Sequence, residues 1–166
     1  MIHGYNRRNA AYLDATIPSF YYEDRPGTII RAWQEITVEF WDHARPNYEV
    51  FVSDETLREL KDMGYPESKR QKCLALVDTL PRLAVTPEVE ELAAFFVGEG
   101  AMPANDLGDA FHLAFATWYH LQYLLTWNCK HLANANKFEH IQILMCRRRL
   151  VAPLLVTPEQ LLEIYP

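Results

Sequence analysis

Short apolar runs alternate along the chain with longer segments in which apolar residues recur at helical spacing. The short runs predict strands, which fall at residues 11–13, 48–52, 82–85, 122–126 and 151–156. Apolar positions three and four apart predict helices, which fall at 28–43, 54–63, 66–80, 87–97 and 109–120. This alternation is typical of βα units. We therefore predict an α/β fold with three α/β/α layers and a mainly parallel central sheet.

The ends of the chain are patterned less clearly. Residues 128–138 are polar and predict a short helix and a loop, while 141–150 fits either a strand or a helix. Thr157, followed by Pro158, predicts the start of a closing helix. No repeat or linker interrupts the chain, so we expect a single domain over 1–166, with 1–10 as a flexible lead-in to the first strand.

Composition and charge narrow the class of protein. The length of 166 residues suits one domain with its own core. A formal net charge of −6 is unlike that of general nucleic-acid binders, but it does not exclude an enzyme that meets nucleic acid only at a bound metal ion. Three cysteines without a Cys-x-x-Cys pair indicate reduced thiols, so we expect a cytoplasmic protein. We expect no membrane span and no signal peptide.

Polar residues lie where an open parallel sheet binds its ligands, beyond the carboxyl ends of the strands. Asp14 ends the first predicted strand, and Glu59 lies in the helix after the second. Asp109 opens the helix before the fourth strand, and Asn128 follows that strand. If these side chains converge, the carboxylates repel one another unless a cation neutralises them. Mg²⁺ or Mn²⁺, which prefer oxygen ligands, would suit such a cluster.

The same positions resemble the motifs of the PIN-domain family. Tyr12–Ser19 is similar to the family's first strand with its acid, and Ser53–Leu60 is similar to its second acidic segment. Asp109–Ala114 resembles the third acidic segment, and Leu124–Leu132 resembles the fourth segment. The form Trp-Asn-x-x-His in the fourth segment is found in one subgroup of the family. The segment Thr157–Leu161 also resembles that subgroup.

The resemblance implies an RNase-H-like fold and a metal-dependent endoribonuclease, closest to the VapC toxins of type II toxin–antitoxin pairs. It implies Asp14, Glu59 and Asp109 as ligands of Mg²⁺ or Mn²⁺, with Asn128 as a further catalytic residue. Thr16 and Thr126 are expected to position the substrate. RNA is the expected substrate, and the expected partners are an antitoxin protein and a second copy of the chain in a homodimer.

Two features leave alternatives open. Asn128 stands where the family often has Asp, and an amide brings no charge, so catalysis by one or by two metal ions stays open. The chain could also be a catalytically weak or inactive PIN-fold module that binds RNA or protein. A phosphatase that phosphorylates Asp14 is a further alternative, although Thr16 stands where that motif requires a second Asp.

Each candidate also has a purely structural interpretation. Asp14 could be a turn residue, Glu59 a solvated helix residue, and Asp109 an N-cap, with Asp106 as its rival. His112 is expected to be a hydrogen-bonded histidine of the core or of an interface. Three other groups have competing interpretations. The aromatic residues Phe20, Tyr21 and Tyr22 could stack on RNA bases or contact an antitoxin, and the three arginines at 147–149 could bind phosphate or form a solvated basic patch. The spacing of Cys129, His131, His140 and Cys146 argues against a zinc site.

Overall fold

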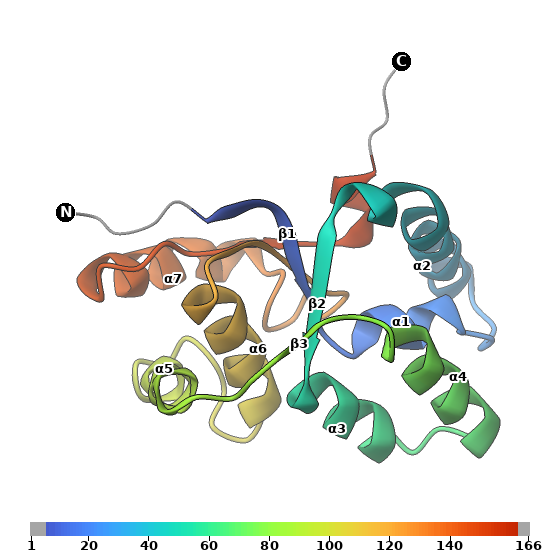
Figure 1. Cartoon of the computed structure of the whole chain (residues 1–166), viewed down its shortest axis with the longest axis horizontal. Coiled ribbons are helices and arrows are strands. Elements are labelled where there is room, and N and C mark those ends of the chain that lie inside the picture. The colour runs from blue at the N-terminus through green and yellow to red at the C-terminus, as the bar shows by residue number, and fades with distance from the viewer. Residues whose placement is uncertain (1–5, 163–166) are drawn as a thin grey trace.

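Five strands form one parallel sheet at the centre of the protein (Figure 1). The structure is a computed structural model in which residues 6–162 are described. The strand order is β3-β2-β1-β4-β5, and the strands are β1 (Arg7–Leu13), β2 (Glu49–Ser53), β3 (Arg82–Leu83), β4 (Leu121–Leu125) and β5 (Leu154–Val156). The predicted α/β class with a parallel sheet is confirmed.

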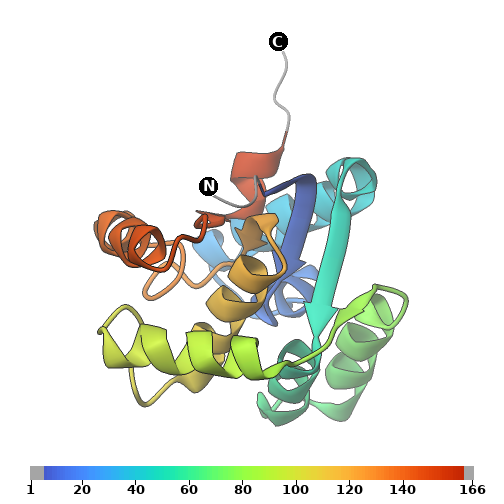
Figure 2. The ribbon, with the colours of Figure 1, turned by 60° about the vertical axis from the view of Figure 1, so that its left-hand side comes forward.

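The helices pack on both faces of the sheet (Figures 1 and 2). One face carries α1 (Thr16–Tyr21), α2 (Thr28–Glu39), α3 (Asp54–Asp62) and α4 (Glu67–Val77). The other face carries α5 (Pro87–Gly98), α6 (Leu107–Trp118) and α7 (Ala135–Arg147). A π-helical turn (Phe40–Ala44) extends α2, and short 3₁₀ turns lie at Arg45–Asn47 and Pro158–Leu161. Within residues 6–162, no helix is long and apolar enough to cross a membrane.

Alternation along β1 divides the core into two parts. Tyr12 points into the cluster formed with α5, α6 and α7, and its neighbour Leu13 points into the cluster formed with α1 to α4. Both side chains are fully buried. Successive side chains of a strand face opposite sides of the sheet, so a strand covered by helices on both sides is apolar at consecutive positions.

The strand order places a change of direction at β1. The chain moves from β1 outward to β2 and β3, and then returns to the opposite side of β1 to form β4 and β5. The carboxyl ends of β1 and β4 are therefore followed by segments that leave on opposite faces. In open α/β sheets, a crevice forms at such a point and binds ligands.

Several predicted boundaries need correction. Arg7–Ala10 belong to β1, not to a flexible lead-in, because they pair with β2 and β4; residues 1–5 lie outside the described part. The ambiguous stretch 141–150 is helical to Arg147, because Ile141, Leu144 and Met145 make one buried stripe at helical spacing. The third strand is shorter than predicted, and the closing helix is only a 3₁₀ turn.

Two leucines in neighbouring strands differ in burial, so truncating them should lower the free energy of unfolding by different amounts. Leu124 in β4 is fully buried, whereas Leu154 in β5 is 51% exposed. We expect Leu124→Ala to lower the free energy of unfolding by about 2–5 kcal/mol, because it leaves a cavity in the core. Leu154→Ala should cost less than about 1 kcal/mol. Urea unfolding of both variants tests this, and equal losses would contradict the two-sided burial of the sheet.

Candidate active site at the carboxyl edge of the sheet

A cleft of about 280 Å³ lies beyond the carboxyl ends of β1 and β4. It brings together Asp14, Glu59, Asp109 and Asn128, the side chains that the sequence pattern singled out. Its remaining lining residues are Thr16, Arg58, Asp62, Met63 and Asp106. We refer to it below as the acidic cleft.

Asp14 sits at the floor of the acidic cleft, directly after β1. Asp14 is only 2% exposed. Both of its carboxylate oxygens accept hydrogen bonds from threonine hydroxyls, Oδ1 from Thr16 and Oδ2 from Thr126. The backbone N–H of Thr16 also donates to Oδ1 at 3.0 Å. Burial raises the pKa of Asp14 above its usual value, although His112 and the two threonine hydroxyls oppose that rise.

The two threonines connect the carboxyl ends of β1 and β4. Each hydroxyl donates to Asp14 and accepts a backbone N–H of the segment after β4, Thr16 from Trp127 and Thr126 from Asn128, both at 2.8 Å. Thr126 is fully buried. Its side chain therefore supports Asp14 from within the protein, and the substrate-positioning role expected of Thr126 stays a prediction. Thr16 is half-buried, lines the cleft and gives the same support.

Glu59 enters the acidic cleft from α3 and is held by a buried histidine. Its Oε2 lies 2.9 Å from Nε2 of His112, and the side chain of Glu59 keeps 24% exposure. On the other side of the ring, Nδ1 of His112 lies 2.8 Å from the hydroxyl of Tyr12. Burial lowers the pKa of His112, but Tyr12, Glu59 and Asp14 raise it, and the net pKa lies well above the usual value. The contact with Glu59 therefore favours the protonated form of His112.

The close approach of α6 to Glu59 requires a glycine at position 108. A Cβ built on Gly108 would overlap Oε1 of Glu59 and would lie 3.1 Å from Oε1 of Glu55. Side-chain atoms do not overlap in this way, so any side chain at position 108 would move Glu59. Gly108 therefore lets the carboxylate of Glu59 lie against the first turn of α6.

Asp109 and Asn128 face each other across the acidic cleft. The amide Nδ2 of Asn128 donates to both oxygens of Asp109, at 2.9 and 3.0 Å, while its Oδ1 accepts the N–H of His131 at 3.0 Å. The amide oxygen is therefore directed at the backbone, and Asn128 holds Asp109 instead of offering an oxygen to a cation. Asp109 is not an N-cap, because α6 begins at Leu107, with Asp106 at the cap position.

The carboxylates of the acidic cleft influence one another. Burial, and after it the nearby charges of Asp106, Asp14 and Glu59, together raise the pKa of Asp109 to about 7. His112 acts in the opposite direction. Raised carboxyl pKa values are expected where acids share a site without a neutralising cation.

The oxygen atoms that the acidic cleft offers are of the type that binds a hard divalent cation. Asp14, Glu59 and Asp109 offer carboxylate oxygens, the ligands that Mg²⁺ and Mn²⁺ prefer. Among residues 6–162, however, no three side chains of the Asp, Glu, His or Cys type lie close enough to hold a metal ion as they stand. Each carboxylate is bound to a neighbour instead, so binding a cation requires Glu59 and Asp109 to turn toward Asp14.

Two residues that shape the acidic cleft were not assigned a role in it from the sequence. His112 was expected to be a hydrogen-bonded core histidine, and it is buried and hydrogen-bonded, but its partner is the candidate ligand Glu59. Gly108 lay just before the predicted helix at 109–120, and a glycine next to an acid gave only a weak signal. A three-residue spacing puts Asp109 and His112 on one side of α6, and this spacing was the signal available for His112.

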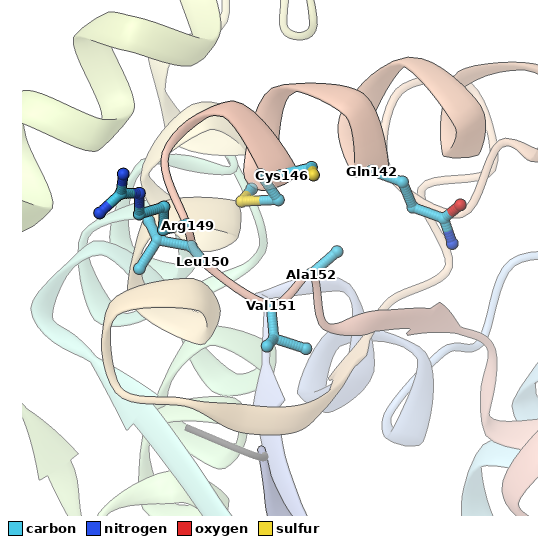
Figure 3. Close-up of a pocket in the computed structure, with 7 residues that line it drawn as sticks. Gln142, Cys146, Arg149, Leu150, Val151 and Ala152 are labelled. Atoms are coloured by element: carbon cyan, nitrogen blue, oxygen red, sulfur yellow. The ribbon is translucent and has the colours of Figure 1, made fainter. Parts of the chain in front are cut away.

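A second cavity, of about 540 Å³, lies between α7 and the segment that leads into β5 (Figure 3). Its lining residues are Gln142, Met145, Cys146, Arg149, Leu150, Val151 and Ala152, and none is acidic. This cavity is at the amino end of β5, whereas Asp14 follows the carboxyl end of β1. Because the strands are parallel, the two cavities lie at opposite ends of the strands. The acidic cleft is the better candidate active site, although it is the smaller cavity, because it holds the candidate carboxylates.

No family model matches this chain, and no curated protein is similar enough to be matched with it. Inference about function therefore rests on the geometry of the acidic cleft and on the sequence motifs.

Substituting Gly108 should disturb the acidic cleft without unfolding the protein. We expect Gly108→Ala to fold normally, because alanine favours a helix over glycine by about 1 kcal/mol. The added methyl group should displace Glu59 and weaken Mn²⁺ binding by roughly 10- to 100-fold, as do losses of supporting contacts at metal sites. Gly98→Ala, at the end of α5, is the matched control because its Cβ would meet nothing within 4 Å. Calorimetry with Mn²⁺ that finds equal affinities in the two variants would refute this role for Gly108.

The raised pKa of Asp109 predicts how stability depends on pH in metal-free protein. The folded state keeps this proton up to about pH 7, whereas the unfolded chain loses it near the ordinary value of 3.8. Between these values the folded state binds more protons, so the free energy of unfolding falls as pH rises. From about pH 5 to about pH 8 we expect a loss on the order of 2 kcal/mol, since one pKa unit corresponds to about 1.4 kcal/mol.

The measurement is urea unfolding in EDTA, with Asp109→Asn as the comparison. The variant should lose most of this decline and keep only the part that Asp14 contributes in the same direction. Parent and variant curves with the same slope would contradict the assignment.

Proposed function

We propose that this protein is a metal-dependent endoribonuclease of the PIN-domain type, with a three-layer RNase-H-like fold. The observation that carries the proposal is the convergence of four motif segments, distant in sequence, on one cleft. Asp14 comes from the end of β1, Glu59 from α3, Asp109 from α6 and Asn128 from the segment after β4. The proposal rests on this convergence and on the resemblance of the motifs to those of VapC toxins.

In this proposal, Asp14, Glu59 and Asp109 hold Mg²⁺ or Mn²⁺ in the acidic cleft. A divalent cation supplies a water of lowered pKa and offsets the negative charge that builds up on the phosphodiester. Asp14 needs little reorganisation, because Thr16 and Thr126 already fix its carboxylate. Asn128 orients Asp109 through its amide group, and His112 holds the carboxylate of Glu59 next to Gly108.

The second candidate function is a PIN-fold module that binds RNA or protein without cutting. One observation favours it: Asn128 and His112 already engage the carboxylates of Asp109 and Glu59, so the acidic cleft is partly compensated by the protein itself. The phosphatase alternative has less support. Asp14 would have to attack phosphorus, yet both of its oxygens accept hydrogen bonds and the residue is almost fully buried.

The expected RNA substrate, antitoxin and homodimer belong to the same proposal. They follow from the VapC resemblance, as does the cytoplasmic location suggested by the reduced cysteines.

The nuclease proposal predicts metal-dependent cleavage of RNA by the purified protein. A pool of cellular RNA should be cut with Mg²⁺ or Mn²⁺ and left intact with EDTA. Asp14→Asn and Glu59→Gln should each lower the rate at least about 100-fold, because losing a ligand costs more than losing a supporting contact. Asp78→Asn is the control, since Asp78 is exposed at the end of α4 and lines no part of the cleft.

Circular dichroism should show that all variants keep the fold. A folded parent protein that cuts no RNA under any of these conditions would reject the nuclease and leave the binding module.

A further inference from the structure

A groove adjoins the acidic cleft and has a different chemical character. Its volume is about 510 Å³, and it shares Thr16 and Met63 with the acidic cleft. One wall comes from α1 and the turn after it, and the other comes from the segment that leads into α4. We call it the side groove. The side chains on which the argument depends are Phe20, Glu23, Arg25, Tyr65 and Lys69.

The two cavities differ in charge. The acidic cleft is lined by five carboxylates, Asp14, Glu59, Asp62, Asp106 and Asp109, and by one cation, Arg58. The side groove is lined by two cations, Arg25 and Lys69, and by two carboxylates, Glu23 and Asp24. The charges that line the side groove therefore balance, whereas those that line the acidic cleft are mostly negative. A polyanion that extends from the acidic cleft into the side groove would meet cations there.

The two cations are fixed in place by one buried acid. The side chain of Glu23 is 1% exposed; its carboxylate lies 2.7 Å from Nη2 of Arg25 and 3.2 Å from Nζ of Lys69. Burial raises the pKa of Glu23, but the hydrogen bonds from Arg25 and the ion pair with Lys69 outweigh this and lower it to about 2. Glu23 thus stays ionised and keeps both cations at the side groove. Side chains already held in place lose less entropy when a ligand binds.

Aromatic rings complete the side groove. Nζ of Lys69 lies 4.5 Å from the ring centroid of Tyr65, and the hydroxyl of Tyr65 is hydrogen-bonded to Ser19. Phe20 is half-buried and packs edge-on against Trp33 at 5.4 Å between centroids. A fixed aromatic ring beside fixed cations is the combination that binds single-stranded nucleic acid, through base stacking and phosphate contacts.

We propose that the side groove binds the nucleotide next to the scissile phosphate of a single-stranded RNA. Lys69 and Arg25 contact its phosphate, and its base stacks on the face of the Tyr65 ring opposite Lys69. This inference rests on the proposed ribonuclease function, because it extends a strand from the acidic cleft past Thr16 and Met63. It gives a chain of net charge −6 a local means of holding RNA.

The test measures RNA binding separately from cleavage. All variants carry Asp14→Asn, so the probe, a fluorescent single-stranded oligoribonucleotide, stays intact while anisotropy is recorded with Mg²⁺ at several salt concentrations. Lys69→Gln should weaken binding and make the slope of log affinity against log salt shallower by about 0.7, the value for one lost phosphate contact. Arg25→Gln should do the same, and it is the safer variant because Arg25 is largely exposed. Tyr65→Leu should weaken binding roughly 5- to 100-fold without changing the slope.

Two matched controls separate local from general effects. Lys61→Gln removes an exposed lysine of α3 that lines neither cavity, and Tyr119→Leu removes a half-buried tyrosine on the opposite face of the sheet. Both should bind RNA like the parent. The inference is overturned if the side-groove variants also bind like the parent, even when the wild-type chain cuts RNA. If the side-groove variants lose binding but the wild-type chain never cuts, the side groove stands and the nuclease proposal fails.

Discussion

The hydroxyl group of Tyr12 is the point at which the elements that carry the acidic cleft meet. It lies 2.7 Å from Oγ of Ser53 at the end of β2, 3.1 Å from Oγ1 of Thr56 in α3 and 2.8 Å from Nδ1 of His112 in α6. A buried polar group without a partner costs about 1–3 kcal/mol, so these groups constrain one another to a single arrangement. Through His112 the constraint reaches Glu59. The position of the partly exposed carboxylate of Glu59 thus depends on a tyrosine inside the sheet.

A second set of contacts fixes the other half of the acidic cleft. The hydroxyls of Thr16 and Thr126 join Asp14 to the segment after β4, and the indole of Trp127 donates to Thr37 of α2 at 2.8 Å. Hydroxyl, amide and imidazole groups thereby contact the acids of the cleft, which explains how the fold tolerates the cluster without a metal ion. Asn128 fits this pattern, because an aspartate in its place would face Asp109 with a like charge.

The sequence was sufficient to predict the α/β class with a parallel sheet from local patterns. Together with the resemblance of four short segments, it also singled out Asp14, Glu59, Asp109 and Asn128, which line the acidic cleft. Apolar runs separated by helical periodicity predict a parallel sheet, and acids after strands fall at its carboxyl edge. What could not be predicted depends on contacts between distant residues. The support of Asp14 by Thr126 joins residues 112 positions apart, and the approach of Gly108 to Glu59 depends on how α6 packs against α3. The orientation of Asn128 follows from the backbone N–H of His131, which no side-chain pattern reveals.

We propose that Asp14, Glu59 and Asp109 form one cation site. The most direct test is a crystal of the protein soaked in Mn²⁺ and measured for anomalous scattering. We predict a strong peak in the acidic cleft, about 2.0–2.3 Å from carboxylate oxygens of Asp14 and Asp109, with Glu59 turned toward it. No peak there at saturating Mn²⁺, with the carboxylates still bound to Thr126, His112 and Asn128, would contradict the claim.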